Sequence, residues 1–158
     1  MVVGFDLDGV IFKPVLPFYG LIKKFNLDFL VYKLRRITSI KNTFYHSIKI
    51  NRSVAQILKQ LESYHKIVII SGHSEKYREE VRNCLLKNGI SFDALLLRPD
   101  KSDYFNFKLK KVIETKCDFY IDDRKDLVNY LQRRLNGICR IIYYKNSSSL
   151  TELNLLIT

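Results

Sequence analysis

The chain has 158 residues, 47% of them hydrophobic and 13% aromatic, which is enough apolar material for one domain with a core and argues against a disordered chain. No apolar run reaches the roughly 18–20 residues of a membrane span, and the N-terminus shows no signal-peptide pattern. The three cysteines are scattered and odd in number, so we expect a reduced, cytoplasmic protein without disulfides or a structural zinc site.

Positive charge is concentrated in one quarter of the chain. The net charge is +11, and residues 13–52 contain nine lysines and arginines but a single acid, Asp28, for a net charge of +8. Such a segment attracts anions. It forms either a solubilising helix face or a surface that binds an anionic substrate, and its composition leaves both interpretations open.

The first predicted strand, at residues 2–5, ends in a pair of acids. Asp6 and Asp8 are separated by one residue, so at the end of a strand their side chains lean toward the same site. Gly9 follows and allows the backbone to turn away sharply. Two carboxylates that share a site repel each other, and a divalent metal, a shared proton or a cationic side chain must compensate them.

Residues 14–52 have a different pattern. Apolar side chains recur mostly at spacings of three or four, which indicates amphipathic helices. We therefore expect a small helical insertion at 14–52 in a core domain formed by 1–13 and 53–158. Seven aromatic residues lie in the insertion: Phe18, Tyr19, Phe25, Phe29, Tyr32, Phe44 and Tyr45. Their rings either form the core of the insertion or bind nucleotides together with the basic residues.

Helices and apolar strands alternate over the rest of the chain. Helices are predicted at 53–64 (with Ser53 as the cap), 74–87, 104–116, 125–135 and 150–157, and strands at 67–70, 93–97, 119–121 and 138–144, with a loop at 146–149. Continuous apolar strands that alternate with helices predict an α/β fold, a Rossmann-like parallel sheet of about five strands with helices on both faces.

Polar side chains follow several of these strands at their carboxyl ends, where parallel sheets bind ligands. They are Asp6 and Asp8, Ser71 and Gly72, and Asp122 and Asp123, with Lys108 on a neighbouring helix. Together they supply what phosphoryl transfer needs: a nucleophile, ligands for Mg²⁺ and groups that hold phosphoryl oxygens. Each motif alone is more often a turn, a cap or a solvated lysine, so the prediction depends on their shared placement. His73, close to Ser71, either reaches the substrate or is a solvated loop histidine, and we favour the second interpretation.

Two of these positions have competitors nearby. We prefer Lys108 over three other lysines because Val112 and Ile113 can bury the other face of its helix, which leaves Lys108 near the rim. Asp126, one helical turn further on, competes with Asp123 as the second acid of the last motif, and we favour Asp123. The competing lysines are Lys101, Lys110 and Lys111.

With these motifs in this order, the chain resembles the haloacid dehalogenase (HAD) superfamily, and specifically its phosphatases. The resemblance covers nearly the whole chain, and the first motif and the Tyr-Ile-Asp-Asp motif at 120–123 are its strongest parts. It implies that Asp6 is the nucleophile that forms an aspartyl-phosphate, and that Asp8 is the general acid and then the base that activates water. The implied phosphate ligands are Ser71, Gly72 and Lys108, and Lys108 also steadies the nucleophile. The implied Mg²⁺ site uses Asp6, the backbone carbonyl of Asp8, Asp122 and, through water, Asp123.

The resemblance also suggests substrates. The insertion at 14–52 stands where many of these phosphatases carry a helical cap that selects the substrate. Arg98, ten residues before Lys108, and the Ile-Asp-Asp-Arg run at 121–124 give a looser resemblance to polynucleotide 3′-phosphatase domains. We therefore expect a Mg²⁺-dependent phosphatase that acts on a small phosphometabolite or nucleotide, with a 3′-phosphorylated nucleic-acid end, bound through the basic cap, as the alternative substrate. We expect no membrane partner. A non-catalytic module that binds phosphate or nucleic acid is the third hypothesis, and an intact pair of acids at 6 and 8 counts against it.

Overall fold

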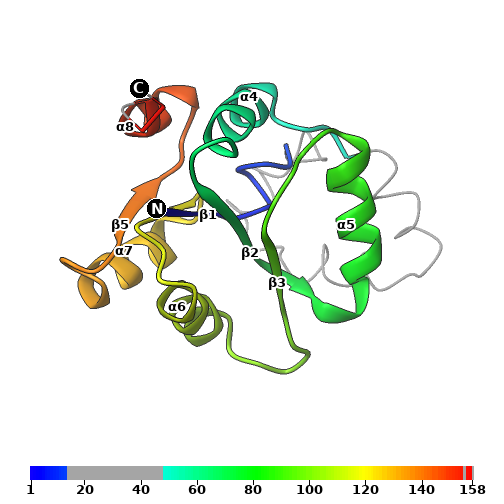
Figure 1. Ribbon diagram of the computed structural model, residues 1–158. Coiled ribbons are helices and arrows are strands. Elements are labelled where there is room, and N and C mark those ends of the chain that lie inside the picture. Colours follow the sequence, from blue (N-terminus) through cyan, green and yellow to red (C-terminus); the bar gives the residue numbers. More distant parts are fainter. Residues whose placement is uncertain (14–47, 155, 158) are drawn as a thin grey trace.

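Five parallel strands form one sheet at the centre of the molecule (Figure 1). The structure is a computed structural model that describes residues 1–13, 48–154, 156 and 157, so most of the predicted helical insertion lies outside the described residues. In the described part, the strand order β3-β2-β1-β4-β5 confirms the predicted α/β, Rossmann-like sheet. The strands are β1 (Val2–Phe5), β2 (Lys66–Ser74), β3 (Ala94–Arg98), β4 (Phe119–Asp122) and β5 (Arg140–Tyr143).

Helices cover both faces of this sheet. They are α4 (Arg52–Leu61), α5 (Arg78–Lys87), α6 (Tyr104–Glu114), α7 (Lys125–Arg134) and α8 (Thr151–Asn154), with short 3₁₀ helices η1 (Glu75–Tyr77) and η2 (Ser147–Leu150). Because strand side chains alternate between faces, Ile67 and Ile69 pack in the apolar cluster under α4, α5 and α8. Val68 and Ile70 pack in the opposite cluster under α6 and α7 (Figure 1). Apolar burial on both faces explains the continuous hydrophobic run of β2.

One predicted helix cap and one predicted helix start are wrong. α4 begins at residue 52, and Asn51 precedes it in place of the predicted cap Ser53. The Asn51 amide donates to the hydroxyl of Tyr144 at 2.6 Å, a long-range contact that no local pattern reveals. The helix predicted from residue 74 begins only at Arg78, because β2 continues to Ser74 and η1 follows it.

The C-terminal elements are shorter than predicted. The helix expected at 150–157 is the single turn α8, and β5 covers only four of the seven residues expected at 138–144. The loop expected at 146–149 lies mostly in η2, where a capping box between Asn146 and Ser149 stabilises the turn. The other strands and helices that follow α5, namely β3, α6, β4 and α7, begin and end within two residues of their predicted bounds.

The chain leaves and re-enters the described core at one place, next to the loop that carries Asp8. The backbone N–H of Lys13 donates to the carbonyl of Lys49 at 2.8 Å, and Phe12 forms an antiparallel bridge with Ile50. Residues 48–52 therefore pack on the core. The division into a core and a helical insertion stays a prediction, since its main part lies outside the described residues.

No helix among the described residues has the length and apolar character needed to cross a membrane. The cysteines at 84, 117 and 139 are buried and form no disulfide. Burial raises the pKa of all three thiols, that of Cys139 to about 12, so none is a reactive thiolate at neutral pH.

Candidate active site

The loop after β1 is held against β4 by the backbone. The N–H of Asp6 donates to the carbonyl of Ile121 at 2.9 Å, which extends the pairing of β1 with β4. Residues 7–12 then form a tight turn in which the N–H of Gly9 donates to the carbonyl of Phe12 at 2.8 Å. The first motif therefore lies directly beside the end of β4.

A buried lysine joins the acids that follow β1 and β4. Lys108 has no exposed surface, and its Nζ lies 2.6 Å from Oδ1 of Asp6 and 3.2 Å from Oδ2 of Asp122. Nζ also donates to the carbonyl of Ile70 at 2.6 Å and to the hydroxyl of Tyr120. That hydroxyl in turn donates to Oδ2 of Asp122 at 2.9 Å. One ammonium thus contacts two carboxylates within a network that is enclosed by protein.

Burial and charge act against each other in this network. Burial raises the pKa of Asp6 well above its usual range, Lys108 opposes this shift, and Asp122 and Asp8 reinforce it. Burial also disfavours the charge on Lys108, but Asp6 and Asp122 outweigh it and keep the pKa of Lys108 above its usual range. The lysine therefore stays cationic, and Tyr120, whose pKa burial raises, stays a neutral donor.

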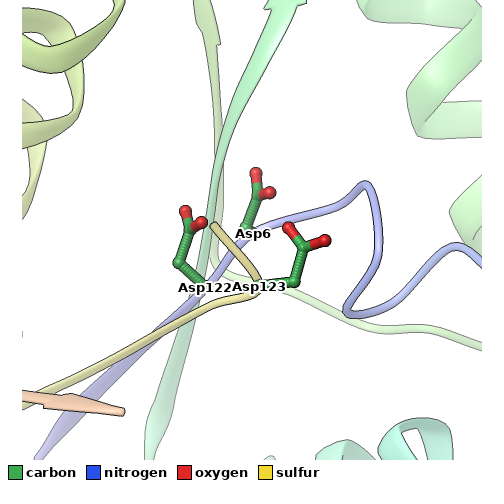
Figure 2. Close-up of side chains that lie close together, drawn as sticks. All are labelled: Asp6, Asp122 and Asp123. Atoms are coloured by element: carbon green, nitrogen blue, oxygen red, sulfur yellow. The ribbon is translucent and has the colours of Figure 1, made fainter. Parts of the chain in front are cut away.

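Three carboxylates form a group with the geometry of a cation site. The side chains of Asp6, Asp122 and Asp123 point to the same side (Figure 2), and one oxygen of each lies within 4.8 Å of the others. Carboxylate oxygens are ligands that Mg²⁺ prefers. The Lys108 ammonium offsets part of the formal charge of −3 on these acids, and a divalent cation among them would offset more of it. The donor set therefore fits the Mg²⁺ that the resemblance implies. The Asp8 carboxylate is not part of this group.

The acid that competes with Asp123 lies apart. Asp126 forms an ion pair with Arg124 at 2.9 Å and is not among the grouped carboxylates, whereas Asp123 is. The backbone N–H of Arg124 donates to Oδ1 of Asp122 at 2.9 Å, so the turn after β4 holds one oxygen of that acid, while Tyr120 and Lys108 contact the other. The geometry favours Asp123 over Asp126 as the second acid.

Lys108 is the lysine that reaches the acids, but the predicted reason is wrong. Its helix buries Lys108 and Val112 together, because residues four apart lie on the same face of a helix, while Ile113 is 51% exposed. Lys108 therefore lies on the buried face of α6 and not near the rim. The competing lysines take no part in the network. Lys110 and Lys111 form ion pairs with Glu114, and Lys101 is exposed.

Ser71 and Gly72 lie at the end of β2. The hydroxyl of Ser71, which is buried, accepts the backbone N–H of His73 at 3.2 Å. A Cβ on Gly72 would lie 2.4 Å from Cε2 of Tyr104, so only glycine leaves room for this ring, whose centroid lies 5.7 Å from Nζ of Lys108. Their part in phosphate binding stays a prediction.

Several neighbours of the site were missed or misinterpreted from the sequence. The interpretation of His73 as a solvated loop residue is wrong, because its side chain is only 9% exposed and its Nε2 lies 3.0 Å from Oδ2 of Asp8. Tyr120 was missed, although its place two residues before an acid of the same strand was a usable signal. Tyr104 and Arg124, whose guanidinium lies 4.9 Å from the ring centroid, meet from separate elements and leave no local signal.

Removing the lysine is expected to cost far more stability than removing one acid. Lys108→Met leaves Asp6 and Asp122 buried without a cation, and losing one partner of a buried ion pair costs about 3–5 kcal/mol. Asp6→Asn leaves Lys108 paired with Asp122, so the free energy of unfolding should change by less than about 1 kcal/mol. Urea unfolding of both variants without Mg²⁺ measures this difference, and equal losses would contradict the network.

Gly9 and Gly89 form a matched pair that tests the place of Asp123. Both have positive φ, +82° and +70°, but a Cβ on Gly9 would lie 2.1 Å from Oδ2 of Asp123, whereas no described atom lies within 4 Å of one on Gly89. Both alanine variants should lose about 1–2 kcal/mol through the left-handed backbone. Only Gly9→Ala must also displace Asp123, so we expect it alone to weaken Mg²⁺ binding, by about tenfold or more. Calorimetric titration measures this, and equal Mg²⁺ affinity in the two variants would argue against Asp123 as a ligand.

Comparison with known proteins bears on the fold. No protein-family model matches the chain, and no curated protein sequence matches it. Among solved structures, a chain from the Pnkp1/Rnl/Hen1 complex matches with a TM-score of 0.64 and 23% identity over 90% of this chain and 45% of that chain. A second structure, of the Pnkp1/Rnl/Hen1 RNA repair complex, matches with a TM-score of 0.64 and 22% identity over 90% of this chain and 42% of that chain. The chain thus spans less than half the length of these neighbours.

A shorter neighbour matches nearly end to end. The HAD domain of the effector protein Lem4 from Legionella pneumophila has a TM-score of 0.52 and 16% identity, over 98% of this chain and 90% of that chain. An inactive mutant of the same domain has a TM-score of 0.53 and 15% identity, over 98% of this chain and 89% of that chain. The chain therefore has a HAD-like fold, as the resemblance in its sequence predicts, and it shares that fold with part of an RNA repair complex.

Proposed function

We propose that this protein is a Mg²⁺-dependent phosphatase that hydrolyses phosphate monoesters through an aspartyl-phosphate on Asp6. The observation that carries the proposal is the network in which Lys108 holds the Asp6 carboxylate at the carboxyl end of the sheet. Asp8 lies two residues further on, with 39% of its side chain exposed. A nucleophile fixed in protein beside an acid that faces solvent suits attack on a phosphate that enters from outside.

The reaction proceeds in two steps. A carboxylate oxygen of Asp6 attacks phosphorus, the bond from phosphorus to the ester oxygen breaks, and the leaving oxygen takes the proton from the Asp8 carboxyl group. Water then attacks the phosphorus of the aspartyl-phosphate and gives a proton to the Asp8 carboxylate. The bond from phosphorus to Asp6 breaks, inorganic phosphate leaves, and both acids return to their starting states.

The remaining residues counter negative charge. Lys108 opposes the rise in the Asp6 pKa and orients the nucleophile, and the buried hydroxyl of Ser71 would donate to a phosphoryl oxygen. Asp6, Asp122 and Asp123 would hold Mg²⁺, which offsets the negative charge of the phosphoryl group when bound.

The first choice of substrate is a small phosphometabolite or a nucleotide. A 3′-phosphorylated nucleic-acid end is the second candidate, and two observations favour it: the likeness of fold to a chain of an RNA repair complex, and the net charge of +8 on residues 13–52. A non-catalytic binding module has no need of a nucleophile and an acid, so we rank it last. A cytoplasmic location, expected from the cysteines, remains part of the proposal.

Hydrolysis of p-nitrophenyl phosphate tests the activity directly. The wild-type protein with Mg²⁺ should be active, EDTA should abolish turnover, and Asp6→Asn should lower kcat by about 10⁴-fold or more, because the residue that forms the covalent bond is lost. Asp126→Asn is the matched control, since this acid lies outside the carboxylate group, and it should keep wild-type activity.

The same assay ranks the substrates and the alternatives. A much higher kcat/KM on a 3′-phosphorylated oligonucleotide than on a nucleoside monophosphate would favour the second candidate. Activity that survives in Asp6→Asn would overturn the mechanism. A folded wild-type protein that hydrolyses none of the three esters would favour the binding module.

A further inference from the structure

The side chain of His73 contacts the acid of the proposed mechanism. Nε2 of His73 lies 3.0 Å from Oδ2 of Asp8, within hydrogen-bond distance. The imidazole is 9% exposed, whereas the Asp8 side chain is 39% exposed, so the histidine approaches from the protein side and leaves the acid open to solvent. Oδ2 accepts an Nε2–H whether Asp8 is ionised or carries a proton on Oδ1. The contact is therefore compatible with both states that the mechanism needs.

An irregularity in the pairing of β2 with β3 lies at His73. β2 pairs with β3 through Ser71 and Leu97, and the next pair is Ser74 with Arg98. Two residues of β2 between these pairs therefore have no paired residue in β3. Such bulges re-aim side chains at the edges of sheets. The inserted residues are Gly72 and His73, and they lie at the end of the strand that faces the first motif.

Two further contacts hold His73, one through its backbone and one through its ring. The backbone N–H of His73 donates to Oγ of Ser71 at 3.2 Å. The ring of Phe12 meets the imidazole edge to face, with centroids 6.4 Å apart and an angle of 81° between the planes. Phe12 is buried and closes the turn that carries Asp8, so histidine and acid belong to one packed unit.

We infer that His73 is a positioning residue for Asp8: its Nε2–H binds Oδ2 and holds the carboxyl group so that Oδ1 carries the proton to the leaving oxygen. This inference rests on the proposed function. In the first step the proton passes from Oδ1 of Asp8 to the ester oxygen as the bond from phosphorus to that oxygen breaks. His73 itself gains and loses no proton in this account.

Misplacing the acid should lower activity most on esters whose leaving oxygen depends most on protonation. Nitrophenolate leaves without much help, whereas an alkoxide does not. We therefore expect His73→Ala to lower kcat/KM by about tenfold or less on p-nitrophenyl phosphate and by about 100-fold on glycerol phosphate, within the range that general acid catalysis contributes. The value of kcat/KM reports the step in which the ester bond breaks, so slow release of phosphate does not hide the effect.

Three variants give the test its controls. His73→Gln keeps an amide N–H near the place of Nε2, and should restore activity on glycerol phosphate to within about threefold of wild type, because it restores the hydrogen bond. His65→Gln changes a histidine immediately before β2, whose Nε2 lies 2.8 Å from the carbonyl of Leu156, and should leave the activity on both esters unchanged. In Asp8→Asn, the further change His73→Ala should cost nothing more, because the histidine acts through the acid.

The outcomes separate this inference from the proposed function. If His73→Ala is folded by its melting temperature but loses equal activity on both esters, or if His73→Gln is as impaired as His73→Ala, the positioning role is wrong while the phosphatase stands. The same holds if adding His73→Ala to Asp8→Asn lowers the activity by a further factor. If the wild-type protein hydrolyses neither ester, or if activity survives in Asp6→Asn, the proposed function fails and this inference fails with it.

Discussion

The buried ammonium of Lys108 between Asp6 and Asp122 is the interaction on which the rest of the site depends. Two buried carboxylates repel each other and lose hydration, and the free-energy cost is tolerable only because one cation contacts both. The lysine comes from a helix on one face of the sheet, and the acids come from two neighbouring strands. The network therefore forms only when β1, β4 and α6 are in their final places, which ties the site to the fold.

The site has an enclosed half and an open half. Asp6, Lys108 and Asp122 are buried and held by hydrogen bonds on several sides, whereas Asp8 and Asp123 are partly exposed. In the proposed mechanism the covalent chemistry occurs where the buried half meets the open half, and the proton moves in the open half. The two described ends of the basic segment, joined by a hydrogen bond between residues 13 and 49, also lie beside this open half.

Much of this arrangement could be predicted from the sequence because it is carried by local patterns. The apolar strands, the acids that follow them and the helices between them all have a period or a boundary that can be counted, so Asp6, Asp122 and Asp123 were placed together correctly. Lys108 contacts these acids, but from the buried face of α6 and not from the rim, and the pattern of α6 does not by itself show that a lysine lies on the buried face. A buried lysine can be expected there only once it is known that Asp6 and Asp122 are buried and need a cation between them.

Other features could not be predicted because they depend on residues that are distant in the sequence. The bulge in β2 is defined by its register with β3, and the contact of His73 with Asp8 joins residues that are 65 positions apart. Asn51, which precedes α4, contacts Tyr144, more than ninety residues away. Tyr104 fits over Gly72 only once both strand and helix are in place. In each case a tertiary contact overrides the local preference.

The central claim is that Asp6 carries the phosphoryl group during turnover. The most direct test mixes the wild-type protein with Mg²⁺ and p-nitrophenyl phosphate, quenches with acid within the first turnover and locates any bound phosphoryl group by mass spectrometry of peptides. The account predicts that the group is found on the peptide that contains Asp6, at that residue, and that it disappears when the ester is exhausted. Turnover with no phosphorylated protein at any quench time, or a phosphoryl group on another residue, would contradict it.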